Sequence, residues 1–356
     1  MTRSMEKSIS TFSALLYMLL PLTFATKPPS NVTALFVFGD STVDPGNNNY
    51  IPTTARADHL PYGRDLPNHE PSGRNTNGKL VTDFLASYLG LKELLPAYLD
   101  PRLSEKELIS GVSFASAGMG LDEITCRRSN VLNMSTQLDN FDEAVKRMQR
   151  MFGPGETMRI VSDAIFILSA GTNDMLVNAY NLRIGRSNIS VTEFHDFLLQ
   201  NTQLIIQRLY EVGARKIAIV GHPPIGCLPL QVTLSGKFPR SCIDSQNKDS
   251  QDFNSKLGLL LSTLQSNLTE DTKLNFLDIY TPVMDMINEP ASFGFETTLR
   301  GCCGTGLFEL GSSCNIFSPT CPDASKYVFF DAVHPSEAAS EHVSKTMYES
   351  LARMIA

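Results

Sequence analysis

Charged residues are scarce in this sequence, and the signatures of several common kinds of site are missing. Only 19% of the 356 residues are charged and 42% are hydrophobic, a balance that excludes a disordered or highly solvated protein. The net charge is -7 and no run of lysine and arginine could follow a phosphate backbone, so we expect no nucleic-acid partner. The chain also lacks H-E-x-x-H, C-x-x-C and G-x-x-x-x-G-K-[ST] sequences, which leaves no support for a zinc, redox or nucleotide-phosphate site. We therefore expect a globular protein that uses no metal and no cofactor.

The N-terminus has the composition of a secretory signal peptide. Arg3 and Lys7 precede an apolar stretch at residues 12–24, and the small residues Ala25 and Thr26 follow it. The stretch is short and contains a proline, which favours a cleaved signal over the alternative, a retained membrane anchor. We expect residues 1–25 to be the signal peptide and residues 26–356 to form a single secreted, extracellular domain without stable membrane insertion.

Glycosylation sequons and cysteines agree with export. The sequons lie at Asn31, Asn133, Asn188 and Asn267, and such sites are glycosylated only in a secretory lumen. Four of the seven cysteines fall within residues 302–321, a Gly-rich stretch that we expect to be a disulfide-bonded loop. Because seven is odd, at least one thiol is free or bonded to another molecule, and the connectivity stays open.

Apolar runs and helical patterns alternate along the chain. The expected strands are residues 34–38, 111–115, 164–168, 216–220 and 273–279, and the expected helices include residues 81–89, 138–151, 191–212 and 251–265. Uninterrupted apolar runs fit parallel strands that are buried on both faces. The alternation predicts a three-layer α/β/α sandwich around a mainly parallel five-stranded sheet, with its sites at the carboxyl ends of the strands.

The parts of an acyl-transfer site can be assigned at these strand ends. Such a site needs a nucleophile, a base, a group that orients the base, and donors for the oxyanion. Ser41 follows the first run, at a turn that would expose its hydroxyl, and is the candidate nucleophile. His334 is the candidate base, and Asp331 can accept a ring N–H from it and fix its tautomer. The candidate oxyanion donors are the backbone N–H groups of Ser41 and Gly118 and the side-chain amide of Asn173.

Four blocks carry a family resemblance. GDSTVDPGNNNY from Gly39, GVSFASAG from Gly111, SAGTND from Ser169 and DAVHP from Asp331 resemble the blocks of the plant-type GDSL esterase/lipase family, part of the SGNH hydrolases. The resemblance follows the chain in order over roughly residues 34–350. It implies a flavodoxin-like fold, hydrolysis of lipid-like or acetyl esters through an acyl-enzyme, no metal, and the site roles assigned above.

Each candidate residue also has a purely structural interpretation. Ser41 and Asn173 could cap helices, and Gly118 could occupy a tight turn, which is compatible with aiming its N–H. Ser113 is a rival nucleophile because residues 111–115 differ by one residue from a G-x-S-x-G elbow, and its structural interpretation is a buried strand hydroxyl. The D-x-x-H motif at Asp331 and His334, together with Asn173, favours Ser41 as the nucleophile.

Two further questions stay open in the sequence. Tyr62, Gly63 and Arg64 lie in a Pro-rich loop and are candidates for lining an acyl or alcohol pocket, with an ordinary surface loop as the alternative. The candidate triad of Ser41, Asp331 and His334 would also serve an acyltransferase that forms the same acyl-enzyme, whereas an inactive extracellular binding protein on this fold should lack a triad member. None is missing, and we expect a small-molecule or lipid ester as substrate.

Overall fold

The computed structural model describes residues 32–181 and 188–356. The predicted signal peptide and the sequon at Asn31 lie outside these residues. Within them, no helix is long and apolar enough to cross a membrane.

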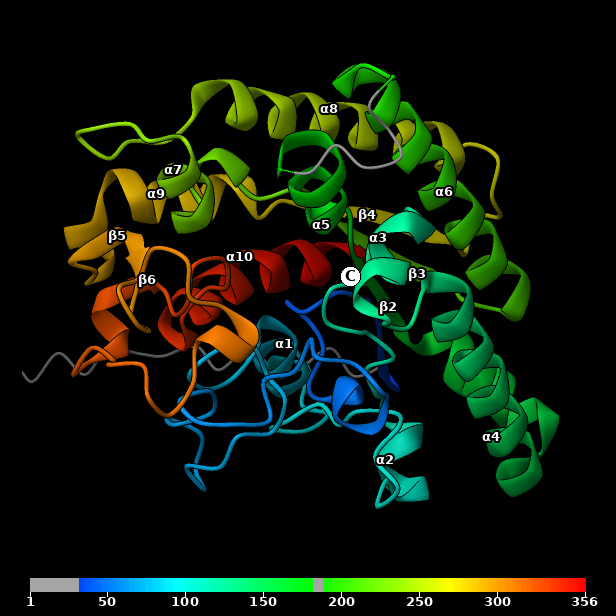
Figure 1. The fold of residues 1–356 in the computed structure, drawn as a ribbon. Coiled ribbons are helices and arrows are strands. Elements are labelled where there is room, and N and C mark those ends of the chain that lie inside the picture. Colours follow the sequence, from blue (N-terminus) through cyan, green and yellow to red (C-terminus); the bar gives the residue numbers. More distant parts are fainter. Residues whose placement is uncertain (1–31, 182–187) are drawn as a thin grey trace, which may run out of the picture.

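Strands and helices alternate along the chain as expected (Figure 1). The strands are β1 (Leu35–Gly39), β2 (Ile165–Ser169), β3 (Lys216–Val220), β4 (Lys273–Leu277), β5 (Thr297–Gly301) and β6 (Tyr327–Phe329). The helices are α1 (Val81–Tyr88), α2 (Glu105–Ile109), α3 (Glu123–Ser129), α4 (Met134–Asp163), α5 (Thr172–Asp174), α6 (Val191–Val212), α7 (Pro229–Leu234), α8 (Asp244–Gln265), α9 (Tyr280–Asn288) and α10 (Glu337–Ile355).

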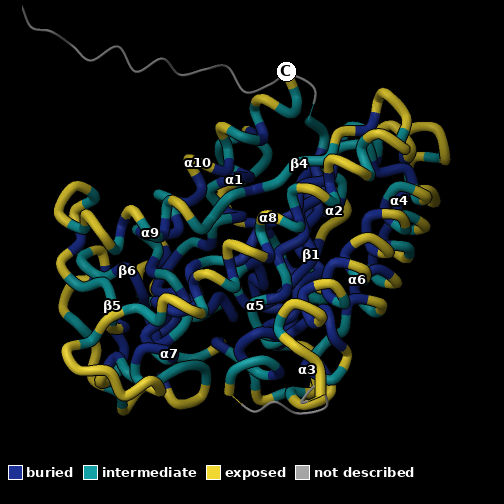
Figure 2. The backbone as a smooth tube through the Cα atoms, turned by 90° about the horizontal axis from the view of Figure 1, so that it is seen from above, coloured by how far each residue is buried: buried dark blue, intermediate teal, exposed yellow. Residues whose placement is uncertain are grey.

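The central sheet is parallel, with the strand order β1-β2-β3-β4. Helices α1 and α10 lie side by side on one face, and α4, α6 and α8 cover the other (Figure 1). Figure 2 shows the buried backbone concentrated along the strands, with exposed segments around the periphery. This arrangement is the predicted three-layer α/β/α sandwich, and β5 pairs with β6 in a separate two-stranded sheet.

The expected fifth strand is present only as an irregular extended segment. Residues 111–115 run parallel to β1 and share backbone hydrogen bonds with it, including Val37 N–H to Val112 C=O and Phe114 N–H to Val37 C=O, but only one complete bridge forms, between Val37 and Ser113. On the side away from β1, the Ser113 carbonyl accepts the Tyr98 N–H and the Ser113 N–H donates to the Pro96 carbonyl. The regular sheet therefore has four strands rather than five, because the next bridge is not completed: Gly39 N–H donates to Gln137 Oε1 at 2.9 Å instead of to this segment.

Aromatic packing fixes one face of the sheet against α4. Phe36, Phe38 and Phe166 occupy alternate strand positions and so project on one side, as the two-residue period of a strand requires. Phe141 of α4 meets Phe36 and Phe166 at ring-centroid distances of 5.3 and 5.4 Å, and Phe114 stacks on Phe38 at 5.1 Å. Ring pairs at these distances add to the stabilisation from burial.

Helix limits follow local signals that the periodicity alone did not show. Helix α4 begins at Met134 because the Asn133 side chain accepts the Thr136 N–H, and it bends at Gly153, whose φ is 78°. Helix α6 matches its predicted limits, since a Ser190–Glu193 capping box starts it and Gly213, with φ 111°, ends it.

Six of the seven cysteines form disulfides. The bonds are Cys227–Cys242, Cys302–Cys321 and Cys303–Cys314, and the last two confirm the predicted disulfide-bonded loop. Cys126 is the free thiol, and burial raises its pKa to about 12. The stretch that these two bonds close packs against the strand leading to Asp331, because Cys302 N–H and Cys303 N–H donate to the carbonyls of Phe329 and Phe330.

Candidate active site

Ser41, His334 and Asp331 form one continuous hydrogen-bonded chain. His334 Nε2 lies 2.7 Å from Ser41 Oγ, and His334 Nδ1 lies 2.7 Å from Asp331 Oδ2. Asp331 is fully buried, and Ser41 and His334 are 7% and 5% exposed. Because an ionised carboxylate only accepts hydrogen bonds, Nδ1 carries the proton and Nε2 is left to accept one from the serine hydroxyl. This tautomer is the one that a serine nucleophile requires.

The loop around Asp331 is shaped by its own side chain. Asp331 Oδ1 accepts the backbone N–H groups of Val333 and His334, at 2.8 and 2.7 Å. Bonds of this kind curl the chain into a tight turn. The turn brings the imidazole back over the carboxylate, so the D-x-x-H spacing by itself places the second carboxylate oxygen against the ring.

The predicted oxyanion donors come from separate strand ends. Asn173, in α5 after β2, donates a side-chain hydrogen bond to Met119 C=O at 2.9 Å, which ties it to the turn that contains Gly118. Gly118 adopts φ 86°, a conformation that favours glycine. Within the part of the chain that the structure describes, the backbone N–H groups of Ser41 and Gly118 donate to no protein acceptor. Both are therefore available to a ligand.

Three residues of the first block that the sequence analysis did not single out hold the Gly118 segment. Asp44 Oδ2 accepts the Ala117 N–H at 2.9 Å, and Asn48 Nδ2 donates to Ala117 C=O at 2.9 Å. Asn47 Nδ2 donates to Ala115 C=O and to Ser113 C=O. The signal was present in the run DPGNNN, since buried Asn and Asp side chains need partners and short loops supply backbone groups for them.

The rival nucleophile is structural in this geometry. Ser113 is fully buried, and its hydroxyl donates to the carbonyl of Val43 at 2.8 Å. It therefore corresponds to the buried strand hydroxyl that was the alternative interpretation.

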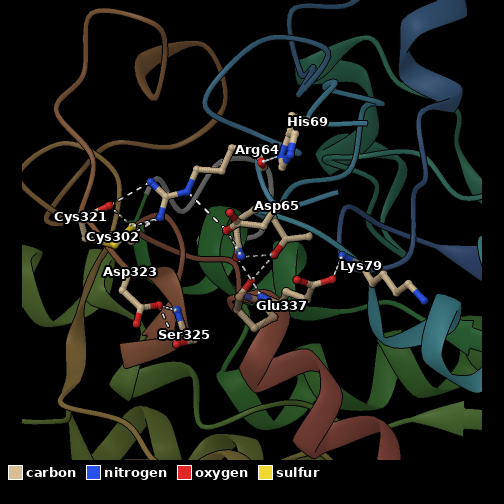
Figure 3. Close-up of polar contacts among 12 residues, drawn as sticks. Arg64, Asp65, His69, Lys79, Cys302, Cys321, Asp323, Ser325 and Glu337 are labelled. Atoms are coloured by element: carbon tan, nitrogen blue, oxygen red, sulfur yellow. Dashed lines mark hydrogen bonds and ion pairs between the residues drawn. A yellow bond between two sulfur atoms is a disulfide. The ribbon is translucent and has the colours of Figure 1, made fainter. Parts of the chain in front are cut away.

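Tyr62 and Gly63 are buried and Arg64 is half-buried, so this segment is not an ordinary exposed surface loop. Tyr62 is fully buried and its hydroxyl donates to Asp331 Oδ2 at 2.7 Å. Arg64 extends toward the Cys302–Cys321 disulfide and donates to Cys321 C=O at 3.0 Å (Figure 3). The segment packs behind the site because its polar groups find their partners there and not in solvent.

Nearby negative charges raise the pKa of the candidate base, His334. Burial lowers the pKa of His334, but the charge of Asp331, its hydrogen bond and the charge of Asp40 outweigh that effect and leave the pKa raised above its ordinary value of 6.5. Asp40 does not bond the imidazole. Its Oδ1 accepts the backbone N–H and the hydroxyl of Thr42, at 2.9 and 2.8 Å.

The raised pKa predicts where ester hydrolysis declines in acid. A general base must be neutral, so kcat/KM should fall as the pH drops through a value above 6.5, and Asp40→Asn should move this acidic limb to lower pH because it removes a negative charge. Steady-state pH profiles of wild type and the variant measure both. A limb that stays in place in the variant would show that Asp40 does not act on the base.

An apolar cavity of about 90 Å³ lies at the same edge of the sheet. Thr42 and Val43, which follow Ser41, line it, and so do Val333 and Pro335 on either side of His334. Helix α10 contributes further apolar side chains, namely Ala339, Val343 and Met347. A water needs about 10–15 Å³ of such space, so the cavity could hold several methylene groups.

Comparisons with known proteins identify the family of this chain. The model of the family described as GDSL-like Lipase/Acylhydrolase matches residues 35–347. A GDSL esterase/lipase of Arabidopsis thaliana is 49% identical over 343 residues, which cover 95% of this chain and 94% of the relative. The chain belongs to the GDSL esterase/lipase family. It is accordingly a carboxylic ester hydrolase, as the four sequence blocks predicted.

Further relatives extend the match. A second Arabidopsis thaliana GDSL esterase/lipase is 44% identical, with 89% of each chain covered. A solved lipase from a goat rumen metagenome covers 90% of this chain and 97% of its own at 14% identity, with a TM-score of 0.39, too low to bear on the fold. Within the described residues of this esterase/lipase, no three His, Cys, Asp or Glu side chains are grouped so that they could hold a metal ion.

Proposed function

We propose that this GDSL esterase/lipase is a secreted serine esterase that cleaves carboxylic esters through an acyl-enzyme. The observation that carries the proposal is the chain of two 2.7 Å contacts from Ser41 through His334 to Asp331. Ser41 attacks the ester carbonyl while His334 takes its proton and Asp331 holds the imidazole in the productive tautomer. The protonated His334 then gives this proton to the leaving alcohol.

The second half of the reaction uses the same groups. Water loses a proton to His334 and attacks the acyl-Ser41 carbonyl, and the acid departs as the serine regains its hydrogen. The N–H groups of Ser41 and Gly118 and the Asn173 amide stabilise the oxyanion in both halves. An alcohol could replace this water, so acyltransfer is the second candidate, and the partition of product when alcohol is added separates the two.

Secretion is supported by surface features as well as by the N-terminal residues. The sequons at Asn188 and Asn267 are exposed, and Asn133 is half-buried. Asn133 caps α4 through its oxygen, so the cap does not use the nitrogen to which a glycan attaches. Residues 26–356 would then form one mature catalytic domain. Disulfides agree with this location because they persist in oxidising compartments.

The cavity favours an apolar acyl chain over an acetyl group. Burial of one methylene is worth about 0.8 kcal/mol, so kcat/KM should rise about fourfold per carbon from para-nitrophenyl acetate to the butanoate and hexanoate esters. Ala339→Leu fills part of the cavity and should remove most of this gain while leaving acetate turnover within about twofold. The initial rates of the three esters, compared at low substrate concentration, measure the effect.

Ala352→Leu is the matched control, because it makes the same change on α10 at a residue outside the cavity lining. It should keep the wild-type preference. An enzyme that prefers acetate, or an Ala339→Leu variant with an unchanged chain-length profile, would show that the acyl chain binds elsewhere.

A further inference from the structure

The triad has a fourth member in the hydrogen-bonded chain. Tyr62 lies 269 residues before Asp331 in the sequence, and its hydroxyl donates to Asp331 Oδ2 at 2.7 Å. This is the same oxygen that accepts the proton of His334 Nδ1. With two backbone N–H groups on Oδ1, the carboxylate accepts four hydrogen bonds, two on each oxygen. All of its strong acceptor positions are therefore used.

The direction of the tyrosine hydrogen bond is fixed by its neighbours. The backbone N–H of Gly311 donates to Tyr62 Oη at 2.7 Å, so the phenol oxygen accepts on that side. Its one proton can then only point to the carboxylate, which has no proton to give. Burial, with the charge of Asp331 and the hydrogen bond to it, raises the pKa of Tyr62 well above 10, so the phenol keeps this proton throughout the working range of an esterase.

The disulfide-bonded loop packs against Tyr62 and bonds its hydroxyl. Gly311 lies within the ring that Cys303–Cys314 closes, and both of these cysteines are buried beside Tyr62. The Tyr62 ring packs edge-on against Phe330, the residue before Asp331, with centroids 5.5 Å apart.

On the other side of the tyrosine, Gly63 N–H donates to Thr76 C=O, and the Thr76 hydroxyl donates to the carbonyl of Pro335, next to His334. Asp65 accepts a hydrogen bond from the Asn77 side chain, and Lys79 N–H donates to Glu337, the first residue of α10 (Figure 3). Tyr62 is thus fixed on one side by the disulfide-bonded loop and on the other by the contacts of Gly63 and Thr76 with the turn that carries Asp331 and His334.

We propose that Tyr62 is a positioning residue that extends the triad to Ser41–His334–Asp331–Tyr62, with the Cys303–Cys314 loop as its seat. The inference rests on the proposed function. By donating to Oδ2, Tyr62 holds the carboxylate plane against the imidazole and shares the negative charge that would otherwise attract the imidazolium proton. Among the described residues the Tyr62 hydroxyl bonds Asp331 and Gly311, and neither Ser41 nor the His334 ring, so it would act through Asp331.

Tyr62→Phe tests the inference with a minimal change of shape. We expect kcat to fall about tenfold with KM nearly unchanged, because a hydrogen bond to a charged group is lost away from the substrate. Asp331 would then act on His334 with its full charge, so the acidic limb of kcat/KM should move to higher pH by several tenths of a unit. A tyrosine that only fills the core would lower the Tm without moving that limb.

Tyr180→Phe is the matched control. Its hydroxyl donates to Asp249 Oδ2 at 2.9 Å, a tyrosine–aspartate hydrogen bond outside the triad. It should keep both kcat and the position of the acidic limb. Equal behaviour of the two variants would overturn the inference.

Replacement of Tyr62 by 3-fluorotyrosine keeps the result decisive if Tyr62→Phe does not fold. The fluorinated phenol is a stronger donor of nearly the same size, so it should move the acidic limb to lower pH, opposite to the phenylalanine variant. An unmoved limb would reject the inference. Failure of the proposed function is distinguishable, because wild type itself would then neither hydrolyse esters nor be labelled at Ser41.

Discussion

Ser41→Ala should lower kcat by about 10⁶-fold, the size of loss seen when the nucleophile of a serine hydrolase triad is removed. The reason lies in the chain of contacts: the serine is the only hydroxyl that His334 Nε2 reaches among the described residues, at 2.7 Å. A fluorophosphonate reports on this group directly, since it forms a covalent adduct with an activated serine. The intact mass of the purified protein before and after treatment measures the adduct.

Ser113→Ala is the matched control for this experiment. Ser41 follows an apolar run and Ser113 lies within one. The Ser113 hydroxyl, however, is fully buried and donates to the carbonyl of Val43. Wild type and Ser113→Ala should therefore both gain one adduct, and Ser41→Ala none. Labelling that survives in Ser41→Ala and is lost in Ser113→Ala would reverse the assignment of the nucleophile.

The sequence predicted those parts of the molecule whose signals are local. The bounds of each strand of the central sheet agree with those of an expected run to within two residues. Strands β1 and β2, which are buried throughout, are almost wholly apolar, as a strand covered on both faces has to be. The candidate base His334 and its partner Asp331 share one turn, so their spacing of three residues was enough to predict that they meet. The blocks around Ser41, Gly118 and Asn173 identified the remaining candidates for the same reason.

The parts that the sequence analysis missed depend on contacts between distant segments. Tyr62 meets Asp331 across 269 residues, and nothing in the PYGR sequence itself indicates a carboxylate partner. The pairing of four cysteines within 302–321 allows three connectivities, and only the packing selects Cys302–Cys321 with Cys303–Cys314. The fifth strand was overestimated because an apolar run reports burial and not the regularity of a hydrogen-bonded ladder.

Asp331→Asn should lower kcat by about 10⁴-fold, as the loss of the correct tautomer does in a serine protease triad. Here the geometry makes the amide a poor substitute in either orientation. Both carboxylate oxygens accept two hydrogen bonds, Oδ1 from two backbone N–H groups and Oδ2 from Tyr62 and His334. Whichever oxygen becomes NH₂, it faces two donors, so the turn loosens or the imidazole changes its tautomer.

Asp40→Asn provides the matched comparison. Asp40 is likewise buried and acts electrostatically on His334, but its hydrogen bonds from Thr42 all reach Oδ1. An asparagine can keep Oδ1 as its oxygen, because no side chain or backbone group of the described residues donates to Oδ2. We therefore expect Asp40→Asn to lose less than about tenfold in kcat at the optimal pH, since only a through-space charge is removed.

The ratio of the two variants separates orientation from charge. Both substitutions remove one buried negative charge near the same imidazole, so a purely electrostatic contribution would make their kcat losses similar. A gap of about three orders of magnitude, measured on variants whose near-UV circular dichroism matches wild type, would mean that hydrogen-bonded orientation of His334 dominates. Comparable losses would instead place the contribution of Asp331 in its charge, and the four-donor arrangement around it would then serve the stability of the turn.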